Sequence, residues 1–244
     1  MKETKKLIKN WGDYSIGITG ANGSLGRSLT KELREKGSNV IGFTHSKVSN
    51  PINHGPNTWV QWRCGEEDSL NEVLSKVNIL IINHGVNLKG QQTAKAINDS
   101  IEINALSSWR LIWNFEKISR QKPLSHPREI WVNTSEAEIQ PALSPTYEIS
   151  KRLIGQIVSM RWNDLEKDET SSLIIRKLVL GPFRSNLNPI GIMSSDNVAK
   201  EVIKKAERNI RLIIVTPNPF TYIFMPITEL KRNFYSNAVK GLNY

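Results

Sequence analysis

Short apolar runs alternate along the chain with longer segments in which apolar residues recur every three or four positions. The runs are rich in β-branched residues and have the length of buried strands. We predict strands over Tyr14–Thr19, Asn39–Thr44, Thr58–Arg63, Val77–Ile82, Glu129–Asn133, Ser172–Leu180 and Arg211–Thr216. We predict helices over Ser24–Lys36, Glu67–Lys76, Ala94–Ser119, Pro145–Asp168 and Ser195–Arg208. This alternation favours right-handed βαβ units, and therefore an α/β fold with a doubly wound, Rossmann-like parallel sheet.

The alternation continues from residue 14 to residue 216 with no internal repeat and no low-complexity linker. We therefore predict a single nucleotide-binding domain over residues 14–216. A basic N-terminal extension covers residues 1–13, and an apolar and basic C-terminal extension covers residues 217–244.

A glycine-rich segment, TGANGSLG, follows the first predicted strand and opens the first predicted helix. In such a turn the first glycine (Gly20) permits a tight bend, the second (Gly23) lets a pyrophosphate approach, and the third (Gly26) lets helix and strand pack closely. The helix N-terminus adds amide donors and a partial positive charge. We predict a phosphate-binding site made of Gly20, Asn22, Gly23, Ser24, Leu25 and Gly26.

The end of the second predicted strand indicates which dinucleotide binds. A site for NAD usually has an acidic residue there to hold the ribose hydroxyls. This chain instead has Thr44, His45, Ser46 and Lys47, which suit a 2′-phosphate. We therefore predict NADP(H) rather than NAD(H), the alternative being a polar loop that contacts no ligand.

Tyr147 and Lys151 lie four residues apart in the fourth predicted helix, and so on one face of it. An isolated phenol has a pKa of about 10 and transfers protons poorly at neutral pH. A neighbouring ammonium lowers that pKa, so that the phenol can donate and accept a proton. We predict a proton-transfer pair.

Five segments, in this order, make the chain resemble the short-chain dehydrogenase/reductase family. They are TGANGSLG, the INHGV after the fourth strand, an Asn in the following helix, a Ser after the fifth strand, and YEISK. The resemblance implies an NAD(P)-dependent enzyme that interconverts a carbonyl and an alcohol by hydride transfer. It implies that Tyr147 is the general acid/base, and that Lys151 lowers the pKa of Tyr147 and binds the nicotinamide ribose.

The resemblance also implies roles for residues outside the Tyr–Lys pair. Asn104 would stabilise a helix kink, and a serine would polarise the substrate oxygen. Ser135 is our preferred serine, although Thr134 fits the family's usual spacing to the tyrosine and stays open as the alternative. The remaining cofactor contacts implied are Asn83, Gly85 and Ser185.

Three departures from the family pattern keep a second hypothesis open. The TGxxGxxG spacing is typical of the extended and atypical branches, some of which bind cofactor without turnover. The acidic residue after the third strand is missing, and His84 replaces a small residue, where we expect it to be packed and hydrogen-bonded. The alternative is a catalytically idle, cofactor-binding regulator or scaffold.

Composition and charge indicate which classes of protein and ligand the chain fits. The 244 residues contain one cysteine, have a mean hydropathy of −0.37 and lack a long apolar run, which favours a soluble cytoplasmic protein. The histidines show no metal-ligand spacing, so we expect no metal. The net charge of +10 divides into +3 in residues 1–10, +5 in residues 197–244 and only +2 between them. Charge confined to the ends does not predict a nucleic-acid groove.

The segment from Pro217 to Ile227 is aromatic, apolar and interrupted by prolines, and basic residues follow it. Three roles suit it: lining a lipophilic substrate pocket, forming a subunit interface, or making a peripheral membrane contact. The family resemblance also implies a homo-oligomer formed through helices near the Tyr–Lys pair.

Overall fold

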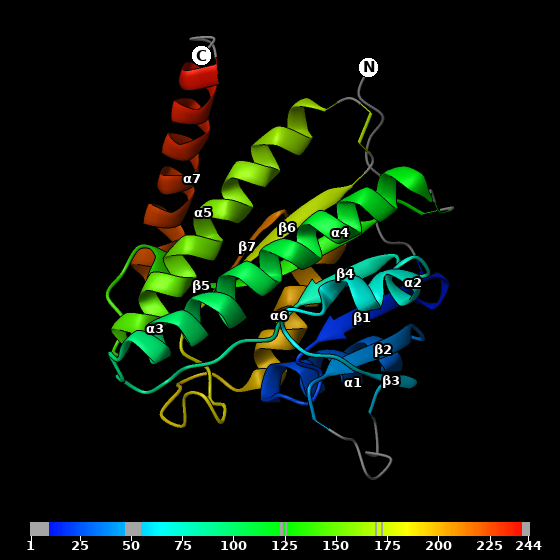
Figure 1. Cartoon of the computed structure of the whole chain (residues 1–244), viewed down its shortest axis with the longest axis horizontal. Coiled ribbons are helices and arrows are strands. Elements are labelled where there is room, and N and C mark those ends of the chain that lie inside the picture. Colours follow the sequence, from blue (N-terminus) through cyan, green and yellow to red (C-terminus); the bar gives the residue numbers. More distant parts are fainter. Residues whose placement is uncertain are drawn as a thin grey trace.

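A parallel sheet of seven strands forms the centre of the molecule (Figure 1). The computed structural model describes residues 10–46, 55–122, 124, 126–168, 170–171 and 173–240. The strands are β1 (Ser15–Thr19), β2 (Asn39–Thr44), β3 (Thr58–Gln61), β4 (Ile79–Ile82), β5 (Glu129–Ser135), β6 (Ile174–Leu180) and β7 (Leu212–Val215). Their spatial order is β3-β2-β1-β4-β5-β6-β7, which confirms the doubly wound, Rossmann-like sheet.

Helices cover both faces of this sheet, as the sequence predicts. The helices are α1 (Ser24–Glu35), α2 (Asn71–Leu74), α3 (Ala94–Ile101), α4 (Ser107–Gln121), α5 (Pro145–Lys167), α6 (Ser195–Glu207) and α7 (Pro219–Lys240). Short 3₁₀ turns lie at Trp11–Asp13, Glu67–Leu70 and Glu136–Glu138. Helices α1 and α6 pack on one face, whereas α4 and α5 lie on the other (Figure 1).

The buried side chains of each strand divide between the two faces because successive strand residues point in opposite directions. In β4, Ile79 and Ile81 join the core beneath α1 and α6, while Leu80 and Ile82 join the core beneath α4 and α5. This division explains why the strands read as continuous apolar runs.

One long helical stretch, Ala94–Gln121, contains a π-helical turn at Glu102–Leu106 between α3 and α4. The sequence predicts a single helix here. A π turn inserts one extra residue and redirects the side chains around it, and such turns are frequent at functional sites. Asn104 lies in this turn and is buried.

Helix α7 was absent from the predicted elements. It contains Pro226 in its interior, and a proline there removes one backbone hydrogen bond. The helix nonetheless forms beside α5 (Figure 1) and buries Thr221 and Met225 against the rest of the fold. No helix in the described part of the chain is long and apolar enough to cross a bilayer.

Candidate active site

The glycine-rich turn has a geometry that only glycine allows at two positions. Gly20 has a φ of +63°, and a Cβ on it would lie 2.9 Å from the Cα of His84. A Cβ on Gly26 would lie 2.3 Å from the carbonyl oxygen of Gly20, so α1 packs as closely as this turn permits. Within the described residues no side chain caps the N-terminus of α1. Its first amides are therefore available to a phosphate group.

The other predicted residues of this turn differ in where they point. Ser24 is the first residue of α1 and lines a cavity of about 500 Å³. Leu25 is buried in the core, so only its backbone can meet a ligand. The Asn22 side chain is tied to the Arg27 guanidinium at 2.7 Å.

The same cavity brings the loop after β6 to the glycine-rich turn, since Ser185 lines it together with Ser24. Its lining residues are Ser24, Arg184, Ser185, Asn186, Pro189, Ile192, Met193, Ser194 and Ser195. A volume of this size is typical of a small-molecule site, and it opens at the carboxyl end of the sheet, where α/β folds bind ligands. The residues present therefore fit a dinucleotide.

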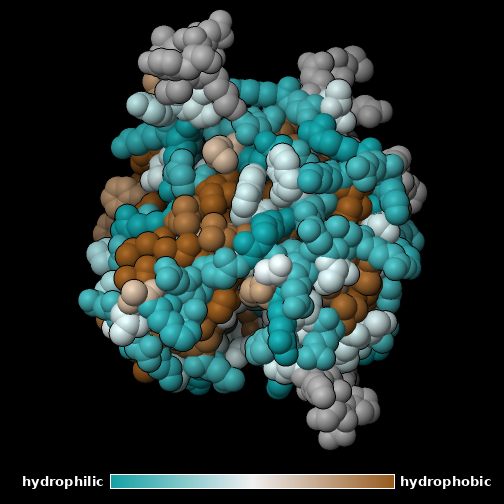
Figure 2. Space-filling view, viewed as in Figure 1, coloured by the Kyte–Doolittle hydropathy of each residue, from teal (hydrophilic) through white to brown (hydrophobic). Residues whose placement is uncertain are grey.

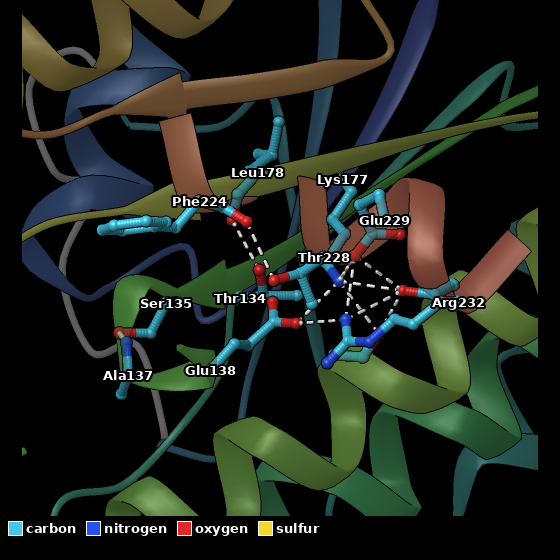
Figure 3. Close-up of polar contacts among 12 residues, drawn as sticks. Thr134, Ser135, Ala137, Glu138, Lys177, Leu178, Phe224, Thr228, Glu229 and Arg232 are labelled. Carbon is cyan, nitrogen blue, oxygen red and sulfur yellow. Dashed lines mark hydrogen bonds and ion pairs between the residues drawn. The ribbon is translucent and has the colours of Figure 1, made fainter. Parts of the chain in front are cut away.

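Ser135, Tyr147 and Lys151 converge at the carboxyl end of β5. The side chains of Ser135 and Tyr147 are hydrogen-bonded, and the Lys151 ammonium lies 5.7 Å from the centre of the Tyr147 ring. Lys151 is buried and donates to the Asn133 carbonyl oxygen at 3.0 Å. Thr134 points away and donates to the Leu178 carbonyl oxygen at 3.2 Å, as Figure 3 shows. The geometry therefore favours Ser135 over Thr134 as the hydroxyl beside the tyrosine.

The electrostatics of this group differ from the expectation. Burial raises the pKa of Tyr147, the Ser135 hydrogen bond opposes that rise, and the Glu136 carboxylate adds to it. Burial also lowers the pKa of Lys151 to about 8, an effect that Glu138 partly offsets. The expected lowering of the Tyr147 pKa by Lys151 is wrong for this structure, because desolvation of the phenol is the largest effect.

Asn104 connects the π turn to the helix that carries Tyr147. Its Oδ1 accepts from the Val86 amide at 2.7 Å, and its Nδ2 donates to the Val86 carbonyl at 2.9 Å and to Ser150 Oγ at 2.9 Å. Ser150 in turn donates to the Tyr147 carbonyl oxygen at 2.8 Å. The side chain of Asn104 therefore joins the loop after β4 to α5. A Cβ on Gly85 would lie 3.0 Å from Asn104 Oδ1, which explains the small residue there.

Two further polar residues, Asn133 and Thr19, complete this network, and the sequence analysis missed both. Asn133 donates to Asn83 Oδ1 at 3.0 Å, and the Asn83 amide nitrogen lies 3.5 Å from the Gly20 carbonyl. Thr19 Oγ1 accepts from the backbone amide of Asn83 at 2.9 Å. The signal for both was their place at the ends of β5 and β1, where a parallel sheet gathers its site residues.

His84 matches its expected environment in part. Its Nδ1 is 2.8 Å from Thr19 Oγ1, and its ring meets Trp62 edge-on with centroids 5.2 Å apart. The expected packing and hydrogen bonding are therefore confirmed at Nδ1, whereas the buried Nε2 has no partner within hydrogen-bond distance among the described residues. Burial lowers the pKa of His84 to about 4, and the Lys151 charge contributes to that shift.

The predicted 2′-phosphate contacts lie at the end of β2. Thr44 is buried and caps the Ser46 amide at 3.2 Å, whereas the His45 side chain is exposed. Lys47 lies outside the described residues. The structure therefore leaves His45 and Ser46 at the surface beside the first two strands.

Comparisons with known proteins agree with this geometry. Residues 16–158 match the model of the NAD dependent epimerase/dehydratase family. The monoglucosyldiacylglycerol epimerase of Synechocystis sp. is 41% identical over 224 residues, which are 90% of this chain and 53% of that protein. This chain thus spans about half the length of the curated relative it matches.

Solved structures share the fold at low sequence identity. A short-chain dehydrogenase from Sphingobium yanoikuyae in complex with NADPH has a TM-score of 0.74 and 17% identity, covering 92% of this chain and 95% of that one. A short-chain dehydrogenase from Leptospira borgpetersenii with bound NAD+ has a TM-score of 0.70 and 15% identity, covering 86% and 95%. These likenesses confirm the resemblance in fold.

Proposed function

We propose, because the chain belongs to the NAD dependent epimerase/dehydratase family, that it inverts one secondary alcohol of a lipid-linked sugar by way of a ketone. The observation that carries this proposal is the convergence of the Ser135 hydroxyl, the Tyr147 phenol and the Lys151 ammonium at one strand end. Epimerisation is the predicted carbonyl–alcohol interconversion run in both directions at one carbon. The 41% identical epimerase supports the sugar lipid as substrate class.

Each residue of the group has one task in this reaction. Tyr147 takes the proton of the sugar hydroxyl and returns it to the ketone oxygen, and Ser135 donates a hydrogen bond to that oxygen. The raised pKa of Tyr147 keeps the phenol protonated, which favours the return of its proton to the ketone oxygen. Removal of the hydroxyl proton needs the phenolate form, and we assign its stabilisation against burial to the Ser135 hydrogen bond and to the Lys151 ammonium 5.7 Å from the ring centre. When bound, the nicotinamide dinucleotide supplies the acceptor and donor for the carbon-bound hydrogen.

Asn104 acts through position. It anchors the π turn to Ser150, one residue before Lys151, and so sets where α5 lies relative to the loop after β4. A shift of about 1 Å in such a group is enough to slow a reaction strongly.

The proposed cofactor is NADP(H), supported by the absence of a carboxylate among the described residues at the end of β2 (Thr44–Ser46). The test replaces His45→Asp at this exposed position and compares both cofactors by titration. We expect NADPH affinity to fall by at least about tenfold, because a carboxylate repels the 2′-phosphate. The cofactor preference is contradicted if the variant binds NADPH as tightly as the natural chain does and if the natural chain binds NADH and NADPH with equal affinity.

The decisive experiment for the function incubates the full chain and cofactor with a glucosyl diacylglycerol dispersed in detergent. Nuclear magnetic resonance of the sugar protons then follows the appearance of the epimer, and Tyr147→Phe is the matched variant. We expect turnover in the natural chain and a loss of about 10²–10⁴-fold in the variant. Tight cofactor binding without any turnover of the sugar lipid would support the idle regulator instead.

We further propose a homo-oligomer formed through α4 and α5. The apolar side chains of Trp113, Ile149 and Met160 are exposed on these helices, and that of Leu106 is exposed at the end of the π turn that precedes α4. Figure 2 shows apolar side chains gathered on the side of the molecule where α5 and α7 lie. An exposed patch of this kind marks an interaction surface, and sedimentation equilibrium of a Trp113→Asp variant tests it.

A further inference from the structure

Helix α7 has its polar and apolar sides reversed relative to an ordinary surface helix. Its inner side carries the polar residues Thr221, Glu229 and Arg232 besides the buried Met225, whereas its outer side is a stripe of large apolar side chains. The exposed residues of this stripe are Phe220, Ile223, Phe224, Ile227, Leu230, Phe234 and Tyr235, whereas Tyr222 turns back to the Thr216 backbone and Lys205. A surface helix normally places its apolar stripe toward the core. This reversal therefore points to an apolar partner outside the described part of the chain.

The polar inner side is held by a buried cluster of charged groups. Lys177 of β6 donates to Glu138 Oε2 at 2.7 Å and to Glu229 Oε1 at 2.9 Å. Arg232 donates to the same two carboxylates at 2.9 and 2.8 Å, as Figure 3 shows. Buried ion pairs of this kind fix the rotation of α7, because turning the helix would separate the charges. The apolar stripe is thus locked outward.

The stripe begins at the carboxyl end of the sheet, where the candidate active site lies. Thr221 is hydrogen-bonded to Gln140 at 2.7 Å, and Gln140 belongs to the loop that leads to Tyr147. In this loop Leu143 is 91% exposed. In the loop after β6, which contributes Ile192 to the cavity lining, Ile190 and Ile192 are 75% and 74% exposed. Exposed apolar side chains therefore lie on three separate segments that follow β5, β6 and β7 at the carboxyl end of the sheet.

The charge of the chain distinguishes between two apolar partners. At the stripe itself, a second copy would bring the same positive charge of residues 197–244 to the contact, whereas an anionic lipid surface complements it. Basic residues lie with the apolar ones: Lys231 is exposed on α7, and Arg184 lines the cavity. Exposed apolar tips flanked by cations are typical of proteins that lie in a membrane interface.

We infer that α7 and the two loops seat the protein on an anionic lipid bilayer, with the active-site cavity facing the lipid. The inference deepens the proposed function, on which it rests for a substrate held in the membrane. A sugar headgroup that projects from the bilayer would then reach Tyr147 without leaving the lipid.

The test is cosedimentation of the full chain with vesicles of phosphatidylcholine, with and without phosphatidylglycerol. The variant Phe224→Asp/Leu230→Asp changes the outer side of α7. The matched control is Leu124→Asp/Ile210→Asp, which makes the same charge change at exposed apolar positions preceding β5 and β7, at the opposite end of the sheet. We expect binding to anionic vesicles that is at least about tenfold weaker in the α7 variant and within about twofold of natural in the control. Circular dichroism verifies that both variants are folded.

Separate outcomes refute the inference and the proposed function. If the natural chain does not bind anionic vesicles, or if the α7 variant binds them as tightly as the natural chain does, the inferred lipid contact is wrong. If the variant instead converts a dimer to a monomer in sedimentation while vesicle binding is unchanged, the stripe binds a second copy and the inference is also overturned. If vesicles bind as expected but no sugar lipid is epimerised in detergent, the surface stands and the proposed function fails.

Discussion

Replacing Lys177→Met should destabilise the protein far more than removing an ordinary surface charge. Lys177 is fully buried, and its ammonium has three N–H donors and four acceptors within 3.0 Å, on Glu138, Glu229, Ser159 and the Gly155 carbonyl. Together with Arg232, this cluster holds two positive and two negative groups. Removing Lys177 leaves one carboxylate buried without compensation, which costs about 3–5 kcal/mol in comparable cases.

That free energy corresponds to a fall in Tm of roughly 6–20 °C for a chain of this size, measurable by calorimetry. Lys76→Met is the control, because Lys76 and Glu72 form an exposed pair 3.4 Å apart whose loss should cost less than about 1 kcal/mol. A second variant, Lys177→Met/Glu138→Gln, removes one charge of each sign and should recover at least about 1 kcal/mol. If Lys177→Met melts within about 2 °C of Lys76→Met, the cluster does not stabilise α7 as argued.

Three other predictions concern the site. Gly26→Ala places a Cβ against the backbone of the glycine-rich turn and should weaken NADPH binding by at least about tenfold in a fluorescence titration, while Gly12→Ala, whose nearest contact would be 3.4 Å, should not. The pKa of His84 is about 4 in the folded chain and about 6.5 in the unfolded chain, so the unfolded chain binds a proton at His84 more readily. The free energy of unfolding should therefore decrease as the pH falls from about 6.5 to 4. Urea unfolding should show about 3 kcal/mol of this loss in the natural chain and not in His84→Asn. Turnover should decline as the pH rises through about 8, where the Lys151 ammonium loses its proton, and a rate that stays level to a pH of about 10 would contradict that role.

The sheet and the helices that cover it could be predicted because each strand and helix is indicated by the pattern of residues within its own segment. The predicted strand and helix boundaries fall within two residues of the structure, since β-branched runs and helical periodicity depend on neighbouring residues. The exception is the helix predicted from Glu67, where a 3₁₀ turn covers Glu67–Leu70 and α2 begins only at Asn71. The π turn at Glu102–Leu106 could not be predicted in this way. It depends on Asn104 reaching the Val86 backbone, a contact between residues 18 positions apart.

The residues of the candidate site likewise divide into those that a local motif predicts and those that depend on distant contacts. Gly20, Tyr147 and Lys151 belong to short motifs whose spacing carries the chemistry. The choice of Ser135 over Thr134 depends on which side of β5 faces α5, and that is decided by the pairing of β5 with β6. The raised pKa of Tyr147 likewise depends on burial by segments distant in sequence, which a motif does not describe.

Two adjacent charges in β6 explain why the C-terminal segment forms a helix despite its prolines. Arg176 and Lys177 are consecutive in a central strand and therefore point to opposite faces, where an unpaired charge would be prohibitively costly. Glu129 of the neighbouring strand pairs with Arg176 at 2.7 Å, on the face beneath α1 and α6. On the other face, Glu229 of α7 completes the partners of Lys177. A helix that must place Glu229 inside leaves its aromatic residues outside, so the exposed apolar stripe of α7 follows from the charge that β6 buries.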